Sequence, residues 1–239
     1  SEFKGLLELS DVRFAYSSRP ETPALDGVNL AIQPGENVAL VGSSGAGKST
    51  LFDLVLRFYD PQSGSVLLDG IDIRELDPQL LRSHIAIVSQ QPAMFTGNVW
   101  DNIRYGRPDA SDDEVRAAAE SAFAHEFIEK LPEGYDSYLG ESGIRLSGGQ
   151  RQRIGIARAL ALGPRYIVCD EPVSALDVSI QAQIINLLQT LQQEENLSML
   201  FISHDLNVVK HLSQRTAVMY LGKIVELSST KQIANNPAH

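Results

Sequence analysis

The stretch Gly42-Ser43-Ser44-Gly45-Ala46-Gly47-Lys48-Ser49 decides the fold, because it follows the phosphate-binding pattern G-x-x-x-x-G-K-[ST]. In this pattern the glycines let backbone N–H groups approach an anion closely. The lysine reaches the β- and γ-phosphates of a nucleotide, and the hydroxyl of Ser49 can bind Mg²⁺. An ordinary glycine turn with a surface lysine is the alternative, and the flanking sequence argues against it.

The sequence on either side of this loop predicts the strand and the helix that phosphate binding requires. Residues 37–41 form an apolar run that is typical of a short buried strand. Residues 50–56 predict a helix directly after Ser49, so the positive N-terminal end of that helix would face the phosphates. Strand, glycine loop and helix therefore occur in the required order.

Composition and charge limit the class of protein. The 239 residues suffice for one large domain with a subdomain, and a hydrophobic content of 43% can build a substantial core. We find no run of about 18 apolar residues, so we expect no bilayer-spanning segment and a chain that is soluble alone. We find no signal peptide, and we interpret Ser1-Glu2-Phe3 as the remnant of a cloning site.

The formal net charge of −10 argues against a nucleic-acid backbone as the main partner, because such binding needs a clustered positive surface. A nucleotide site needs only local donors and is compatible with that charge. Cys169 is the only cysteine, which excludes an internal disulfide and suits a reducing compartment.

The remaining pattern predicts an α/β core with a helical insertion. We expect strands at residues 7–9, 12–16, 28–32, 66–68, 85–88, 166–169, 199–202, 216–220 and 223–227. We expect helices at residues 112–122, 124–130, 151–160, 178–193 and 206–212. The chain is thus predicted to be a single domain, with a core at about 4–90 and 161–239 and a helical subdomain at about 91–160.

Two further segments carry groups suited to phosphate chemistry. In Leu146-Ser147-Gly148-Gly149-Gln150, Ser147 is a good N-cap for the next helix, and the two glycines leave the helix end open to a phosphate. The apolar strand at residues 166–169 ends in Asp170, which can hold Mg²⁺ through water, and Glu171, which can act as a general base. Taken alone, residues 146–150 also fit a capped glycine turn, and residues 166–171 also fit a strand that ends in a solvated acidic loop. The prediction of a phosphate site therefore depends on the phosphate loop and these two segments occurring together in this order.

Together these motifs resemble the nucleotide-binding domain of the ATP-binding cassette (ABC) transporter family, over residues 6–227. Residues 146–150 match the LSGGQ signature of that family, which is far more specific than the phosphate loop. The resemblance implies an α/β fold of the P-loop NTPase (RecA-like) type, with a mostly parallel sheet, an N-terminal antiparallel β subdomain and an inserted helical subdomain. It also implies ATP hydrolysis, with ATP and Mg²⁺ as cofactors.

The resemblance assigns roles to individual residues. As catalytic residues it implies Glu171, His204, Lys48 and Gln90. As nucleotide-binding residues it implies Tyr16, which would stack on adenine, then Gly42, Ser43, Ser44, Gly45, Ala46, Gly47, Lys48, Ser49 and Thr50, and finally Ser147, Gly148, Gly149, Gln150 and Asp177. As metal-binding residues it implies Ser49, Gln90 and Asp170. Gln91 is adjacent to Gln90, and we choose Gln90 because it directly follows residues 88–89 at a strand end.

In that family the signature of one subunit completes the nucleotide site of a second subunit placed head to tail, so that two ATP molecules are sandwiched. The resemblance therefore implies a second copy of the chain or a related cassette as partner. It also implies the transmembrane domains of a transporter, at the cytoplasmic side of a membrane, and no nucleic acid. A soluble cassette protein acting on DNA or ribosomes is an alternative that the net charge disfavours, and a non-cassette P-loop kinase needs no LSGGQ.

The two ends of the chain resemble different subfamilies. Residues 7–160 resemble exporters, most clearly at residues 57–61, 94–99 and 140–143. Residues 161–239 resemble the ATPase subunits of oligopeptide and dipeptide importers, at residues 169–183, 203–206 and 236–239. We interpret the chain as an engineered fusion with its junction at residues 146–160, and a natural hybrid is the alternative. A fused scaffold that binds nucleotide with little or no turnover is the second functional hypothesis.

Overall fold

The computed structural model describes residues 3–140 and 144–236. Three segments used above lie partly outside these residues: positions 1–2 of the N-terminal remnant, positions 141–143 ahead of the signature, and positions 237–239 at the C-terminal end. In the two described ranges, no helix combines the length and the apolar content that crossing a bilayer requires.

The strands are β1 (Leu7–Phe14), β2 (Leu25–Ile32), β3 (Asn37–Gly42), β4 (Ser63–Leu68), β5 (Ile71–Asp72), β6 (Ile85–Val88), β7 (Gly97–Asn98), β8 (Tyr138–Leu139), β9 (Tyr166–Asp170), β10 (Ser198–Ile202), β11 (Arg215–Tyr220) and β12 (Lys223–Ser229). The helices are α1 (Lys48–Val55), α2 (Pro78–His84), α3 (Val99–Arg104), α4 (Asp112–Ser121), α5 (His125–Glu129), the 3-10 helix η1 (Gly134–Asp136), α6 (Gly148–Ala161), α7 (Val178–Glu195), α8 (Leu206–Leu212) and α9 (Thr230–Asn235).

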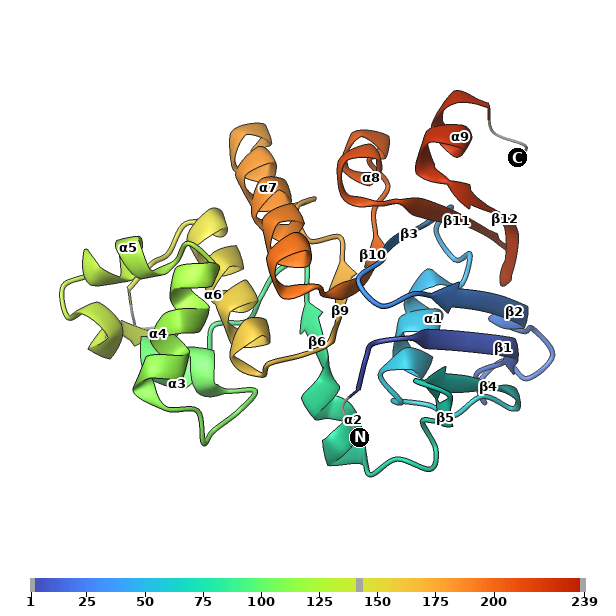
Figure 1. Ribbon diagram of the computed structural model, residues 1–239, viewed down its shortest axis with the longest axis horizontal. Helices are drawn as coiled ribbons and strands as arrows, with labels where there is room; N and C mark the ends of the chain where they lie inside the picture. Colours follow the sequence, from blue (N-terminus) through green and yellow to red (C-terminus); the bar gives the residue numbers. More distant parts are fainter. Residues whose placement is uncertain (1–2, 141–143, 237–239) are drawn as a thin grey trace.

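A mostly parallel six-stranded sheet, in the order β12-β11-β3-β10-β9-β6, forms the centre of the molecule (Figure 1). All neighbouring pairs are parallel except β11 and β12. The phosphate loop follows β3, Asp170 and Glu171 stand at the end of β9, and His204 follows β10. Because the carboxyl ends of parallel neighbours meet at one edge of a sheet, the topology brings these motifs together.

Alternate side chains of the central strands face two separate cores. In β3, Val38 and Leu40 pack with the four-stranded sheet and α1, whereas Ala39 packs with α6 and α7. In β10, Leu200 packs in the core beside the four-stranded sheet, whereas Phe201 packs in the core beside α6 and α7. Because both faces of the central sheet are covered, its strands are continuous apolar runs in the sequence. The prediction of a buried strand at residues 37–41 used this pattern.

A second, antiparallel sheet in the order β2-β1-β4-β5 covers one face of the central sheet (Figure 1). The sequence predicted two strands at residues 7–9 and 12–16, and that prediction was wrong, because the structure has the single strand β1. Its pairing is irregular between Leu9 and Val12, where Asp11 has a φ of 44°. A bulge of this kind interrupts the alternation of side chains, so one strand resembled two. Tyr16 lies beyond the end of β1.

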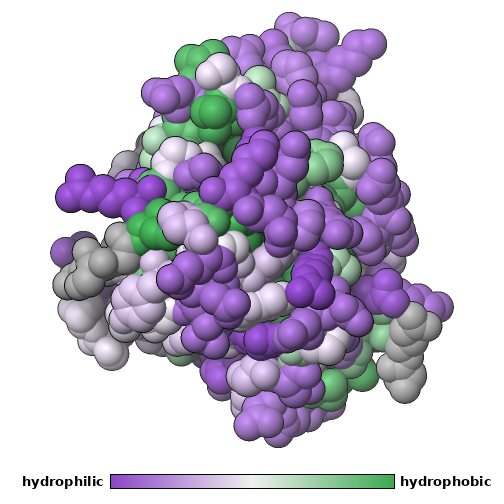
Figure 2. Space-filling view, turned by 90° about the vertical axis from the view of Figure 1, so that its left-hand side faces the viewer, coloured by the Kyte–Doolittle hydropathy of each residue, from purple (hydrophilic) through white to green (hydrophobic). Residues whose placement is uncertain are grey.

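Helices α3, α4, α5 and α6 gather at one end of the molecule, away from the four-stranded sheet (Figure 1). The surface at this end is mostly hydrophilic, with small separate apolar patches (Figure 2). Helix α6 begins at Gly148, earlier than the predicted residue 151, and Ser147 is its N-cap as predicted. The short helices α2, α3 and α9 were not predicted.

The parts of the chain before and after the expected junction do not form separate units. In the central sheet, β3 lies between β11 and β10, and β6 pairs with β9. Strands from both parts therefore share the same two cores. Two polar atoms of the central strands lack a hydrogen-bond partner among the described residues: Oδ1 of the buried Asn37 in β3 and the hydroxyl of the fully buried Tyr166 in β9.

Candidate functional site

The loop between β3 and α1 packs closely against neighbouring backbone of the chain. Gly47 stands at the N-cap of α1 with a φ of 106°, and a Cβ there would lie 2.5 Å from the backbone oxygen of Ala24. Gly42 has a φ of 155°, and a Cβ there would lie 2.4 Å from the backbone oxygen of Met219. Both positions therefore require glycine, so the loop fits closely against its neighbours without side chains in the way.

Lys48 holds a positive charge at this loop. Its Nζ donates to the backbone oxygens of Gly42 at 2.7 Å and Ser43 at 2.9 Å. No side-chain carboxylate within the described ranges competes for this ammonium group through a salt bridge. The charge is therefore available to a phosphate that enters the loop.

A cavity of about 610 Å³ joins the loop to three other segments. It is lined by Tyr16, Arg19, Thr22, Pro23, Ala24, Gly42, Ser44, Gly45, Gly47, Lys48, Ser49, Thr50, Asp170, Glu171, Ile202 and His204. The volume falls in the usual range for small-molecule sites, about 300–1,000 Å³. The structure thus brings the predicted base-stacking residue, phosphate loop, acidic pair and histidine to one space.

The acidic end of the cavity is suited to a hard cation. Burial raises the pKa of Asp170, and the negative charges of Glu171 and Asp53 raise it further, while Lys48 opposes the rise. Such crowding of carboxylates favours a bound cation. Ser49 and Asp170 offer the oxygen ligands that Mg²⁺ prefers. In the part of the chain that the structure describes, no three His, Cys, Asp or Glu side chains form a metal cluster, so water and phosphate oxygens would complete the coordination of a bound Mg²⁺.

Glu171 and His204 are in contact. The Nδ1 atom of His204 lies 3.3 Å from Oε2 of Glu171. Glu171 has a φ of 46°, a left-handed conformation that costs a side-chain-bearing residue about 1–3 kcal/mol. Its N–H donates to the backbone oxygen of Ile202 at 3.0 Å, and the Ser174 hydroxyl donates to its carbonyl at 3.1 Å. These bonds hold the carboxylate at the cavity despite the strain.

The signature segment does not line this cavity. The Ser147 hydroxyl accepts from the Gln150 N–H at 3.2 Å, and the Gln150 side-chain oxygen accepts from the Ser147 N–H at 2.9 Å. This reciprocal capping box starts α6. Gly149 packs against α7, where a Cβ would lie 2.7 Å from the side chain of Ile180. The signature is therefore ordered by local contacts and lies outside the phosphate-loop cavity of its own chain.

Gln90 and Asp177 are also separated from the cavity. Gln90 and Gly148 line a second hollow of about 340 Å³, together with Gln91, Pro92, Ala93, Arg151, Gln152, Ala175 and Leu176. Asp177 is the N-cap residue of α7, is exposed, and makes no side-chain capping bond. The structure thus divides the predicted site into a cavity group and a signature-side group.

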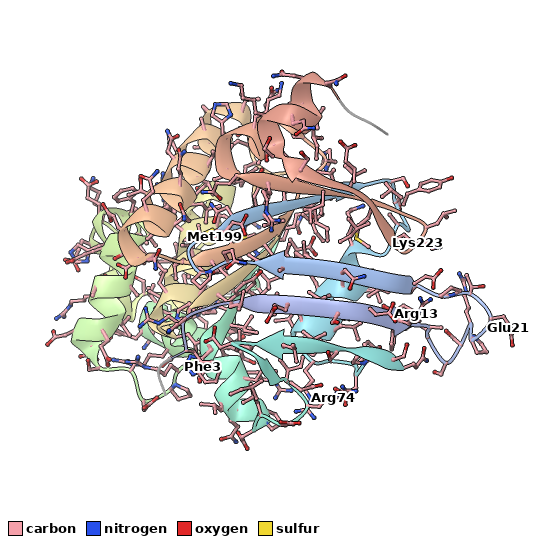
Figure 3. All side chains as sticks on the ribbon, turned by 45° about the vertical axis from the view of Figure 1, so that its right-hand side comes forward. Phe3, Arg13, Glu21, Arg74, Met199 and Lys223 are labelled. Carbon is pink, nitrogen blue, oxygen red and sulfur yellow. The ribbon has the colours of Figure 1, made fainter. Side chains whose placement is uncertain are left out.

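Sequence reasoning missed some cavity residues in the loop after Tyr16. Arg19 lines the cavity, and its N–H donates to the Tyr16 carbonyl at 2.9 Å, which closes a turn. The tip of this loop, at Glu21, projects beyond the ends of β1 and β2 (Figure 3). The position of Arg19, three residues after Tyr16 in one short loop, was the available signal.

Comparisons with known proteins identify the family that the chain resembles. The family model described as "ABC transporter" matches residues 25–174. The Dictyostelium discoideum protein "ABC transporter B family member 1" is 44% identical over 232 residues, which cover 97% of this chain and 25% of that protein. The Drosophila melanogaster "Multidrug resistance protein homolog 65" is 46% identical over 226 residues, which cover 95% of this chain and 17% of that protein.

A solved structure agrees in fold. It is described as "Structure of a bacterial Atm1-family ABC exporter with ATP bound", and it superposes with a TM-score of 0.86 at 36% identity. The match covers 96% of this chain and 39% of that one. The fold is therefore the ABC ATPase fold, a P-loop NTPase with an antiparallel β part and helices, as predicted. This chain spans well under half the length of these relatives.

The comparisons do not support the expected division of the chain. Each alignment continues across residues 146–160 and through most of the C-terminal third, in relatives of the exporter type. Neither an importer-like C-terminal part nor an engineered fusion therefore finds support. The interpretation gave a few short motifs, such as residues 203–206, more weight than the rest of the sequence.

Proposed function

The chain belongs to the ABC transporter family, and from that premise we propose that it binds and hydrolyses ATP to power an exporter-type transporter. The observation that carries this proposal is the single cavity that runs from Tyr16 through the phosphate loop to Glu171 and His204. Its lining combines an aromatic ring, backbone donors, a lysine and carboxylates, which are groups suited to the base, the phosphates and the metal of Mg-ATP.

Each group in the cavity has a chemical task in this proposal. The Tyr16 ring stacks on adenine, and Lys48 with the loop N–H groups binds the phosphates. Ser49 and Asp170 hold Mg²⁺, which when bound neutralises charge on the phosphate oxygens. Glu171 orients and deprotonates the attacking water, and His204, in contact with it, donates to the γ-phosphate.

The signature side of the chain would act on a second copy. Gly148 and Gln90 lie at a hollow separate from the cavity, so one chain alone offers an incomplete site. We propose a head-to-tail dimer in which Ser147, Gly148 and Gly149 close the cavity of the partner. Gln90 lies outside the cavity, so it would reach the metal only after a conformational change. Transmembrane domains would dock near Gln90 and the helical end of the chain, at about residues 91–160.

The ATPase rate per chain against protein concentration tests this proposal. A shared site predicts a rate per chain that rises with concentration and then levels off. A rate per chain independent of concentration contradicts the shared site.

A variant separates chemistry from assembly. Glu171→Gln keeps the shape of the side chain and removes the base, so it should bind ATP, lose turnover and accumulate as a dimer. Glu133→Gln, an exposed position on the helical end, is the matched control and should hydrolyse ATP at the parent rate. Parent-like turnover by Glu171→Gln contradicts the assignment of the base.

A further inference from the structure

Tyr16, whose ring we place beside the base, is held first through its backbone. The side-chain oxygen of Gln62 accepts from the Ala15 N–H at 2.8 Å, and the Gln62 amide donates to the Ala15 carbonyl at 2.8 Å. This paired contact replaces the strand pairing that β1 has lost at this point, and it fixes the chain directly before Tyr16.

Two aromatic neighbours then restrict the tilt of the ring. The rings of Phe14 and Tyr16 meet edge to face, with centroids 5.0 Å apart and planes at 84°. The rings of Tyr16 and Tyr59 do the same at 5.5 Å and 89°. Edge-to-face contacts at these distances are favourable.

The hydroxyl of Tyr16 is held by helix α1. Its oxygen lies 3.0 Å from the Thr50 hydroxyl and 3.4 Å from Oδ2 of Asp53. An ionised carboxylate only accepts hydrogen bonds, so Tyr16 donates to Asp53 and accepts from Thr50. Thr50 and Asp53 are three residues apart and share one face of the helix. The hydroxyl therefore ties the base end of the cavity to the helix that begins at the phosphate loop.

We propose that Asp53 is a positioning residue that fixes the Tyr16 ring for base stacking, an inference that rests on the proposed function. Without this carboxylate, Tyr16 has only the Thr50 hydroxyl, which can donate or accept. The direction of that bond is then no longer defined, and only the aromatic and backbone contacts still restrict the ring. Among the residues that the structure describes, no lysine or arginine forms an ion pair with Asp53, so its hydrogen bond to Tyr16 is its main polar contact.

The charge of Asp53 provides a way to isolate this role. Burial raises the pKa of Asp53, and the hydrogen bond from Tyr16 opposes the rise. The negative charge of Asp53 in turn raises the pKa of Asp170. The charge therefore works against phosphate binding, whereas the hydrogen bond supports base binding. Asparagine separates the two effects, because it keeps an acceptor oxygen and removes the charge.

The test compares ATP with inorganic triphosphate, which has no base. Both are measured on the full chain by displacement of a fluorescent nucleotide, with a metal chelator present to prevent turnover. The variants are Asp53→Ala, Asp53→Asn, Tyr16→Phe, and Tyr16→Phe combined with Asp53→Ala. Asp60→Ala is the charge control, since its half-exposed carboxylate pairs with Arg57 at 3.2 Å.

We expect Asp53→Ala to weaken ATP binding about two- to tenfold, the range that one hydrogen bond supplies, and to leave triphosphate binding no weaker. Asp53→Asn should bind ATP at least as tightly as the parent. Asp53→Ala should cause no further loss of ATP affinity once Tyr16 is phenylalanine. Asp60→Ala should leave the affinity for ATP unchanged.

Three results overturn the inference. They are unchanged ATP binding by Asp53→Ala, equal loss for ATP and triphosphate, and a full additional loss in the Tyr16→Phe background. Retained triphosphate binding also shows that the variant is folded. If the parent displaces the probe with neither ligand, the proposed function itself fails, and this outcome is distinct from the other three.

Discussion

Arg158 joins helix α6 to the segment that follows Gln90, and its removal should destabilise the whole chain. Its Nε donates to the Asn102 carbonyl at 2.7 Å. One Nη2 atom donates to the Ala93 carbonyl at 2.9 Å and to the Asn102 side-chain oxygen at 3.2 Å. The guanidinium also lies 4.8 Å from the centre of the Phe95 ring. The Arg158→Met variant keeps much of the side-chain length and removes all three hydrogen bonds.

The magnitude follows from two opposing effects. Hydrogen bonds from a charged donor contribute about 1.5–3 kcal/mol each, so three supply about 5–9 kcal/mol. Against this, burial lowers the pKa of Arg158 to about 10, and each pKa unit corresponds to 1.36 kcal/mol, so burial of the charge costs about 3 kcal/mol. Two of the bonds share one nitrogen and are weaker than independent bonds. We expect the free energy of unfolding to fall by about 2–4 kcal/mol.

Urea unfolding followed by circular dichroism measures this difference, provided that the slope of the transition is the same in both proteins. Arg82→Met is the matched control, because Arg82 is an exposed arginine on α2 and should change the free energy of unfolding by less than about 0.5 kcal/mol. A loss under about 1 kcal/mol for Arg158→Met would refute the reasoning, since the bonds would then barely exceed the cost of burying the charge.

Three further predictions concern titration, reactivity and binding. The Arg107 side chain, with the Ser111 N–H, lowers the pKa of Glu114 to about 2. The ionised Glu114 therefore stabilises the fold above the usual pKa of a glutamate, and this stabilisation disappears as the pH falls toward 2. In thermal melts, Glu114→Gln should be less stable than the parent at neutral pH and equally stable near pH 2. Burial raises the pKa of Cys169 to about 12, so a thiol reagent at pH 8 should modify it only after unfolding in guanidinium chloride; rapid modification of the folded protein contradicts the burial. Lys48→Ala should weaken ATP binding at least about fivefold, because two charges near 4 Å interact by about 1–4 kcal/mol in such a site. Equal affinities of the two proteins by calorimetry contradict the phosphate-loop assignment.

The central elements of the fold were predictable because their signals are local. The strand before the phosphate loop, the helix after it and the N-cap at Ser147 each depend on residues within one short window. Helix α2 was missed although Asp77 accepts from the N–H groups of Gln79 and Leu80, and Pro78 follows the cap. A helix of one or two turns offers too few periodic positions to be recognised.

The sequence identified the individual motifs of the site, but it did not show that the structure separates them into a cavity group and a signature-side group. Motifs at the carboxyl ends of neighbouring parallel strands lie at the same edge of the sheet. The residues of the cavity group, except Tyr16, could therefore be expected to lie together. The separation of Gln90 from that group depends on how the helical end packs on the core, which no local pattern encodes. The contact of Tyr16 with Asp53 joins residues far apart in sequence and could not be read from either segment.

The central claim is that the cavity between Tyr16 and Lys48 holds a nucleoside triphosphate. A crystal structure of the protein with Mg²⁺ and a slowly hydrolysed ATP analogue tests it most directly. We expect phosphate oxygens within hydrogen-bond distance of Lys48 and the loop N–H groups, with the base on the Tyr16 ring. An empty cavity at saturating analogue, or a nucleotide bound elsewhere on the chain, would contradict the claim.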